Sequence, residues 1–206
     1  SASALGRYVS SLRRGILGGT FDPPHLGHLV LASNARHALQ LDEVWFIPTG
    51  DPYRKAGRAI SSREERLRLV EAAIAELPWA RVSTIELDRD GPTYTTDTLR
   101  ELAGEGGDWW FILGSDALGD LPHWREPATI VAQVRLALAW RPGSGELEIP
   151  QETLRAVPGI ESRIDEVEMP LLEISSTDLR ERVRDGRPTD FLLTPAVRAV
   201  IDELGL

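Results

Sequence analysis

The stretch from Gly18 to Leu29 reads GGTFDPPHLGHL, between the apolar pair Ile16–Leu17 and a helical pattern that runs to about Leu39. Paired glycines let a backbone turn tightly and approach a ligand closely. The helix that follows offers N–H groups and the positive end of its dipole to an anion. His25 and His28 are three residues apart, so they share one face of that helix. The stretch therefore predicts a strand–turn–helix unit that holds phosphate oxygens.

Outward from this stretch, short apolar runs alternate with helical patterns. The predicted strands are Gly15–Leu17, Val44–Ile47, Val82–Leu87, Trp109–Leu113, Leu136–Trp140 and Ile164–Val167. The predicted helices are His25–Leu39, Arg63–Leu77, Thr95–Leu102, Glu126–Gln133, Gln151–Val157, Thr177–Arg184 and Pro195–Leu204. Such alternation predicts an α/β fold, a Rossmann-like doubly wound, mainly parallel sheet with helices on both faces. The loops after Leu17, Ile47, Leu87 and Leu113 would then open along one edge of the sheet.

Composition narrows the class of protein. The chain has 206 residues, 42% of them hydrophobic and 27% charged, which is ordinary for a water-soluble globular protein. We expect residues 1–13 to be a leader or flexible end and residues 14–206 to form a single domain. The chain lacks cysteine, which excludes disulfides and fits a cytoplasmic protein. A net charge of −9 argues against nucleic acid polymers as partners, and no run is long enough to predict a membrane span.

A second motif lies far downstream, where residues 174–180 read ISSTDLR. Its serines and threonine would cap a helix, and a capped helix start with an arginine one turn in is also an anion site. Both motifs match a family pattern, G-G-T-F-D-P-x-H-x-G-H followed by I-S-S-T-x-x-R. The chain thus resembles the bacterial nicotinate-nucleotide adenylyltransferases, which belong to the nucleotidyltransferases with an HxGH motif. The resemblance covers Gly15 to Arg180.

The resemblance implies the ATP site. The backbone from Gly18 to Phe21 would hold ATP, and His25 and His28 would contact its phosphates as charge develops during transfer. A Gly-x-Asp element places Gly114 and Asp116 near the nucleotide sugar, and the second motif would meet the β- and γ-phosphates. The implied ATP-binding residues are Gly18, Gly19, Thr20, Phe21, His25, His28, Gly114, Asp116, Ile174, Ser176, Thr177 and Arg180, and the implied catalytic residues are His25, His28 and Arg180.

The resemblance also implies a site for nicotinate mononucleotide. Thr95, in a segment that reads TYTTDTL, and the backbone N–H of Arg125 would receive the nicotinate carboxylate. The flat ring of Trp124 would stack on the pyridine. Thr49 and a basic residue of the following loop, Lys55 or Arg54, would meet the mononucleotide phosphate. Each element also has a purely structural interpretation, as a helix cap, a core tryptophan and a solvated basic loop.

The implied reaction transfers the adenylyl group of ATP to nicotinate mononucleotide and gives deamido-NAD and pyrophosphate. A phosphate oxygen is the nucleophile, so neither a general base nor a covalent intermediate is expected. Mg²⁺ would travel on the ATP phosphates, with no dedicated metal site in the protein. Three alternatives stay open: a phosphopantetheine adenylyltransferase, an enzyme that uses the nicotinamide mononucleotide or both mononucleotides, and a non-catalytic nucleotide sensor. The sequence also leaves a homo-oligomer open.

Overall fold

The computed structural model describes residues 11–50, 60–114, 117–140, 147–170 and 172–206, and in this part of the chain strands and helices alternate. The strands are β1 (Arg13–Gly19), β2 (Glu43–Pro48), β3 (Ala80–Val82), β4 (Asp108–Gly114), β5 (Arg135–Trp140) and β6 (Ile164–Glu168). The helices are α1 (Leu26–Leu39), α2 (Arg63–Ile74), α3 (Thr95–Leu102), α4 (Ala117–Asp120), α5 (Pro127–Gln133), α6 (Gln151–Ala156), α7 (Ser176–Arg184) and α8 (Pro195–Leu204). Short 3₁₀ turns are η2 (Ala103–Glu105), η3 (Leu121–His123) and η4 (Ile160–Arg163).

The strands form one sheet in the order β3-β2-β1-β4-β5-β6, and every neighbouring pair is parallel. This confirms the predicted doubly wound, Rossmann-like sheet. The chain moves outward from β1 through β2 to β3 and then returns to the other side of β1 with β4. The order therefore reverses between β1 and β4, and the connections after these strands leave toward opposite faces. In open α/β sheets such a reversal opens a ligand crevice at the carboxyl ends of the strands.

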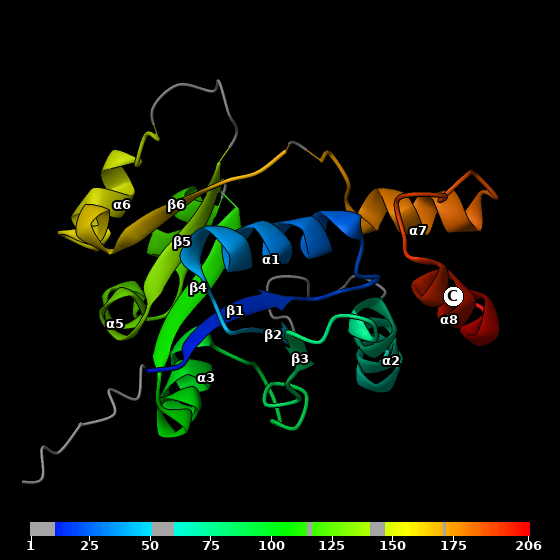
Figure 1. Ribbon diagram of the computed structural model, residues 1–206, viewed down its shortest axis with the longest axis horizontal. Coiled ribbons are helices and arrows are strands. Elements are labelled where there is room, and N and C mark those ends of the chain that lie inside the picture. Colours follow the sequence, from blue (N-terminus) through cyan, green and yellow to red (C-terminus); the bar gives the residue numbers. More distant parts are fainter. Residues whose placement is uncertain (1–10, 51–59, 115–116, 141–146, 171) are drawn as a thin grey trace, which may run out of the picture.

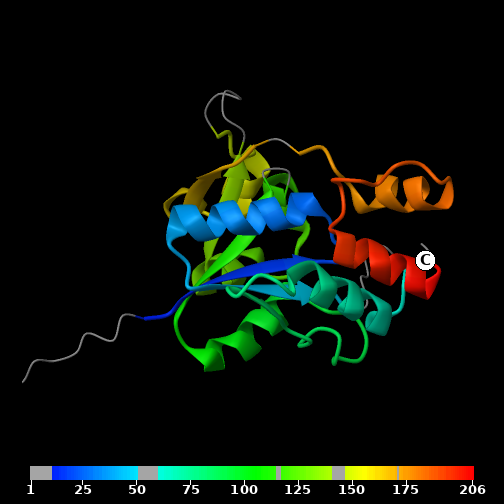
Figure 2. The same ribbon diagram turned by 45° about the vertical axis from the view of Figure 1, so that its right-hand side comes forward.

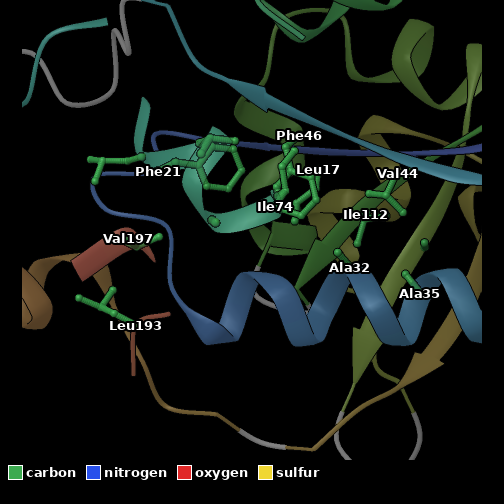
Figure 3. Close-up of a cluster of buried hydrophobic side chains, with 14 of the residues drawn as sticks. Leu17, Phe21, Ala32, Ala35, Val44, Phe46, Ile74, Ile112, Leu193 and Val197 are labelled. Atoms are coloured by element: carbon green, nitrogen blue, oxygen red, sulfur yellow. The ribbon is translucent and has the colours of Figure 1, made fainter. Parts of the chain in front are cut away.

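Helices cover both faces of the sheet because successive strand residues point to opposite sides. In β1, Leu17 packs with α1, α2, α7 and α8, whereas Ile16 packs with α3, α4, α5 and α6. Figure 3 shows the first of these cores, where Ala32 and Ala35 bring α1 close to Val44 and Ile112 of the sheet. The two views in Figure 1 and Figure 2 place α1 and α3 on opposite sides of the sheet, with α7 and α8 together at one end.

One predicted strand is wrong. The segment Val82–Leu87 was expected to be extended, but β3 ends at Val82. The last ladder bond runs from the Ser83 N–H to the Phe46 carbonyl, and the chain then turns, since the Asp88 N–H donates to the Thr84 carbonyl. Leu87 is buried from within this turn rather than from a strand. Hydrophobicity therefore marked a buried segment correctly but gave the wrong backbone for it.

The remaining predicted elements are present with small shifts at their ends. α3 and α8 have the predicted bounds, while α2 ends three residues early, at Ile74. The predicted capping box holds α2, because Ser62 accepts from the Glu65 N–H and Glu65 accepts from the Ser62 N–H. Arg13, the last residue of the expected leader, begins β1. No helix in the described segments is both long and apolar enough to cross a bilayer.

Candidate nucleotide site

The turn from β1 to α1 has an unusual backbone. Phe21 has a φ of 52°, a left-handed conformation that is rare for an aromatic residue. Its ring is 1% exposed and packs edge-on against His28, with 5.0 Å between ring centroids, and against Phe46 at 5.9 Å. The Asp22–Pro23 peptide bond that follows is cis. Burial of the Phe21 ring thus holds a strained turn in place and directs the chain into α1.

The two histidines of the first motif lie one on the other at the start of α1. Their rings are 3.8 Å apart between centroids and tilted by 33°. The backbone N–H of His25 donates to Nδ1 of His28 at 3.1 Å. Because Nδ1 of His28 accepts this bond, the neutral ring carries its proton on Nε2, where it is a hydrogen-bond donor. His28 lines the main cavity of the described chain, whereas His25 lies behind it and is 8% exposed.

Burial lowers the pKa of His25 from its ordinary 6.5 to about 4, because desolvation penalises the imidazolium. The unfolded chain therefore binds more protons than the folded one between these pH values. The resulting stabilisation is complete above pH 6.5 and is lost as the pH falls toward 4. We expect this titration to reduce the free energy of unfolding by up to about 3 kcal/mol over that interval.

Denaturant unfolding at several pH values, compared with a His25→Gln variant, measures this contribution. The difference in unfolding free energy between the two proteins should shrink as the pH drops from 7 to 4. Parallel stability curves would show that His25 does not titrate in this way.

The glycine between the histidines has a steric role. A Cβ atom at Gly27 would lie 2.9 Å from Nδ1 of His25 and 3.0 Å from Cε1 of the same ring. Nδ1 of His25 is itself buried and has no hydrogen-bond partner among the described residues. The spacing H-x-G-H thus lets the His25 imidazole fold against the start of its own helix, directly behind His28.

The start of α1 offers fewer donors than its sequence suggests. The N–H of Leu26 donates to the carbonyl of Leu192 at 3.0 Å, and the N–H groups of His28 and Leu29 both donate to the carbonyl of His25. The imidazole of His28, rather than the backbone of α1 alone, is therefore the polar group that this helix presents to the cavity.

The second motif contacts the first, although about 150 residues separate them. The hydroxyl of Ser176 donates to the carbonyl of Pro23 at 2.8 Å, and Nη1 of Arg180 donates to the carbonyl of Asp22 at 2.7 Å. Ser175 caps α7 by accepting from the Asp178 N–H. The start of α7 is thus fastened to the turn that precedes the histidines.

Across the cavity, α3 and the segment after η3 form the other wall. Tyr94 caps α3 and Thr95 is its first residue. The guanidinium of Arg125 lies over the Tyr94 ring, 4.7 Å from its centroid, and 3.7 Å from the Asp97 carboxylate. Trp124 packs edge-on against Phe111 of β4, with 5.8 Å between centroids. A partly exposed indole, a threonine and a fixed cation thereby face the β1 turn.

These walls enclose a cavity of about 480 Å³ at the carboxyl edge of the sheet. Its lining includes ten of the residues that the sequence selected: Gly18, Gly19, Thr20, Phe21, His28, Thr49, Thr95, Trp124, Arg125 and Ser176. The structure therefore brings the expected ATP and mononucleotide residues to one hollow.

Other selected residues lie beside the cavity rather than in its lining. Arg180 faces a second hollow of about 500 Å³ between α2, α7 and α8, across the Asp22–Pro23 turn. Thr177 is exposed on the first turn of α7, and Ile174 packs against the α1 side of the core. Gly114 ends β4 at the same sheet edge and is exposed. Three further residues, Asp116, Lys55 and Arg54, lie outside the described residues, as does the expected surface loop at 142–145.

Two buried charged residues at the site were missed by the sequence analysis. Glu86 lines the cavity and accepts a hydrogen bond from the Thr98 hydroxyl at 2.8 Å, and burial raises the pKa of its carboxyl group. Arg66 is 2% exposed and donates to backbone carbonyls below the cavity. Both sit in polar segments that are typical of a protein surface. No local pattern distinguishes them, because their burial depends on segments distant in sequence.

The described residues contain no group of three or more His, Cys, Asp or Glu side chains placed to hold a metal ion. The carboxylate nearest the phosphate-binding turn is that of Asp22, which accepts from the Ser61 N–H at 3.2 Å and lies 3.9 Å from Nη1 of Arg180.

The sequence and the fold both have known counterparts. Residues 16–182 match the cytidylyltransferase-like family. A protein of Dehalococcoides mccartyi (strain CBDB1), named a probable nicotinate-nucleotide adenylyltransferase, is 44% identical over 199 residues, which are 95% of this chain and 97% of that protein. A protein of Roseiflexus sp. (strain RS-1) with the same name is 44% identical over 96% of this chain and 99% of its own. Long matches at this identity show a shared family.

The fold resembles that of the Plasmodium falciparum nicotinic acid mononucleotide adenylyltransferase complexed with NaAD. The TM-score is 0.74 at 19% identity, and the match covers 95% of this chain and 97% of that one. A putatively related bacterial structure, from Vibrio parahaemolyticus, gives a TM-score of 0.67 at 18% identity. At these identities the likeness concerns the fold.

Proposed function

Because this chain belongs to the nicotinate-nucleotide adenylyltransferases, we propose that its main cavity holds ATP and nicotinate mononucleotide together and aligns them for transfer. The reaction of the family joins the adenylyl group of ATP to nicotinate mononucleotide in NAD biosynthesis. One observation carries the assignment of the site: His28 and the β1 turn line the same cavity as Thr95 and Trp124. The first wall suits a polyphosphate and the second a flat heteroaromatic ring.

In the proposed reaction a phosphate oxygen of the mononucleotide attacks the α-phosphorus of ATP. The new oxygen–phosphorus bond forms as the bond from the α-phosphorus to the bridging oxygen breaks, and pyrophosphate leaves with that electron pair. The attacking oxygen is deprotonated near neutral pH, so no residue needs to act as a base. The protein contributes alignment of the two substrates and neutralisation of the departing charge.

Within this scheme His28 is the direct phosphate contact. Its Nε2–H is a donor at the cavity wall, fixed in direction by the bond that Nδ1 accepts from the His25 backbone. His25 stays neutral behind it, which avoids repulsion between two imidazolium rings. We assign Thr95 and the backbone at Arg125 to the nicotinate carboxylate, Trp124 to the pyridine ring, and Thr49 to the mononucleotide phosphate.

We propose that ATP enters with Mg²⁺ bound to its phosphates, where the ion neutralises part of their charge. The single carboxylate of Asp22 beside the phosphate-binding turn is already engaged by the Ser61 N–H and by Arg180, so it suits an outer contact better than a closed cage.

The products test this proposal. The protein incubated with ATP, Mg²⁺ and nicotinate mononucleotide should yield deamido-NAD and pyrophosphate in equal amounts, as resolved by chromatography and mass spectrometry. Binding of ATP without any product would instead support the nucleotide-sensor alternative.

We expect Arg180→Ala to reduce kcat/KM for ATP by about 10- to 100-fold and to leave the affinity for the mononucleotide nearly unchanged. The guanidinium holds the Asp22 carbonyl and thereby the turn that carries the phosphate contacts. Loss of a charged hydrogen bond costs about 1.5–3 kcal/mol, which gives this range. Arg184→Ala is the matched control, because that side chain is 72% exposed on the same helix. Calorimetry in which the mononucleotide, and not ATP, binds more weakly would contradict the assignment of α7 to ATP.

A further inference from the structure

Below the cavity, a single buried guanidinium joins three separate segments. Arg66 lies on the first turn of α2 and is 2% exposed. Its Nη1 donates to the carbonyls of Thr20 at 3.1 Å and Thr49 at 2.6 Å. Nη2 donates to the carbonyl of Gly50 at 3.0 Å, and Nε donates to the carbonyl of Ser61 at 3.2 Å. The side chain thus binds the turn after β1, the segment after β2 and the entrance to α2.

Two of these segments form opposite parts of the proposed site. Thr20 belongs to the turn that we assign to ATP, and Thr49 belongs to the wall that we assign to the mononucleotide phosphate. The segments also touch directly, since the Thr49 N–H donates to the Gly19 carbonyl at 2.8 Å. A planar guanidinium fixes several acceptors in one geometry, which an ammonium on a flexible stem does not do.

Gly50 extends this support to the far wall. A Cβ atom at Gly50 would lie 2.2 Å from the backbone oxygen of Glu86 and 2.7 Å from Cγ2 of Thr93. Glu86 and Thr93 both line the cavity, and Glu86 accepts a bond from Thr98 of α3. The backbone at Gly50 is therefore in close contact with the wall that carries Tyr94 and Thr95 on one side and is held by Arg66 on the other.

We propose that Arg66 is a positioning residue that sets the distance between the ATP wall and the mononucleotide wall. This inference rests on the function proposed above, because it concerns the alignment of the same two substrates. Arg66 contacts neither substrate itself. Its loss should misalign the attacking oxygen and the α-phosphorus while each substrate still finds its own wall. Misplacement by about 1 Å is enough to cost on the order of 100-fold in rate.

The test compares Arg66→Lys with Arg68→Lys, a matched control on the same helix whose side chain is exposed and pairs with Glu203. For folded Arg66→Lys we expect kcat to fall by about 30- to 100-fold, while the dissociation constants of ATP and of nicotinate mononucleotide, each measured alone, change less than threefold. The control should match the unmodified protein in all three quantities. A kcat within threefold of the unmodified protein, or a loss explained by weaker binding of one substrate, would overturn the proposal.

A second measurement uses the unmodified protein and does not depend on the variant folding or on turnover. The Nε–H NMR signal of Arg66 should shift when ATP alone is added and also when nicotinate mononucleotide alone is added, because its guanidinium touches both walls. A signal that responds to one substrate only, or to neither, would overturn the positioning role. Failure of the proposed function would appear differently, as an unmodified protein that releases no pyrophosphate.

Discussion

The His28→Ala variant is expected to lose about 100- to 1,000-fold in kcat while it remains folded. In the structure Nδ1 of His28 accepts from the His25 backbone, which leaves the proton on Nε2 at the cavity wall. A donor fixed in this way strengthens its bond as charge builds on the departing pyrophosphate. Removal of one such preorganised donor in other enzymes costs about 2.7–4 kcal/mol, which corresponds to this loss in rate.

Stability should change much less than catalysis. The alanine removes the ring contacts of His28 with Phe21 and His25, and aromatic contacts contribute about 0.5–1.5 kcal/mol each. His37→Ala is the control, since His37 is exposed in the last turn of the same helix. Steady-state kinetics together with denaturant unfolding separates the two effects. A folded His28→Ala protein with near-normal kcat would remove His28 from the mechanism.

The second large effect concerns the choice between the acid and the amide. The proposed nicotinate pocket consists of donors: the Thr95 hydroxyl, backbone N–H groups and the cationic Arg125, which is held over Tyr94 at the rim. A carboxylate accepts from donors with both oxygens, whereas an amide presents an NH₂ group that would face donors and remain unpaired. An unpaired buried polar group costs about 1–3 kcal/mol. We therefore expect the acid mononucleotide to be favoured by about 10- to 100-fold in kcat/KM.

Two variants separate the groups responsible for this preference. Thr95→Val keeps the shape of the side chain but removes the hydroxyl donor, so the preference for the acid should shrink by about tenfold. Trp124→Ala should weaken both mononucleotides by a similar factor, because stacking on the pyridine ignores its substituent. If Thr95→Val instead lowered kcat/KM equally for acid and amide, the hydroxyl would not be the discriminating group.

Much of this architecture could be predicted from local signals. Periodicity gave the order of strands and helices, and the parallel arrangement then placed the loops after β1 and β4 at one edge. The error at Val82–Leu87 arose because a buried turn and a buried strand share the same hydrophobic content, and only the hydrogen bonds after Ser83 distinguish them.

The site was predictable where its chemistry lies in a continuous motif. The turn at Gly18 and the imidazole of His28 are examples. Arg66 was not predictable, because the segment REERLR looks like a charged helix surface until the carbonyls of three distant segments surround the guanidinium. The position of Arg180 beside the Asp22 carbonyl, outside the cavity lining, likewise depends on how α7 docks.

The most direct test is pyrophosphate release by the unmodified protein with ATP, Mg²⁺ and either mononucleotide in parallel. The account predicts turnover with nicotinate mononucleotide and a kcat/KM at least tenfold lower with nicotinamide mononucleotide. Equal kcat/KM values for the two would contradict the donor-only pocket, and release of pyrophosphate with neither would contradict the assigned reaction.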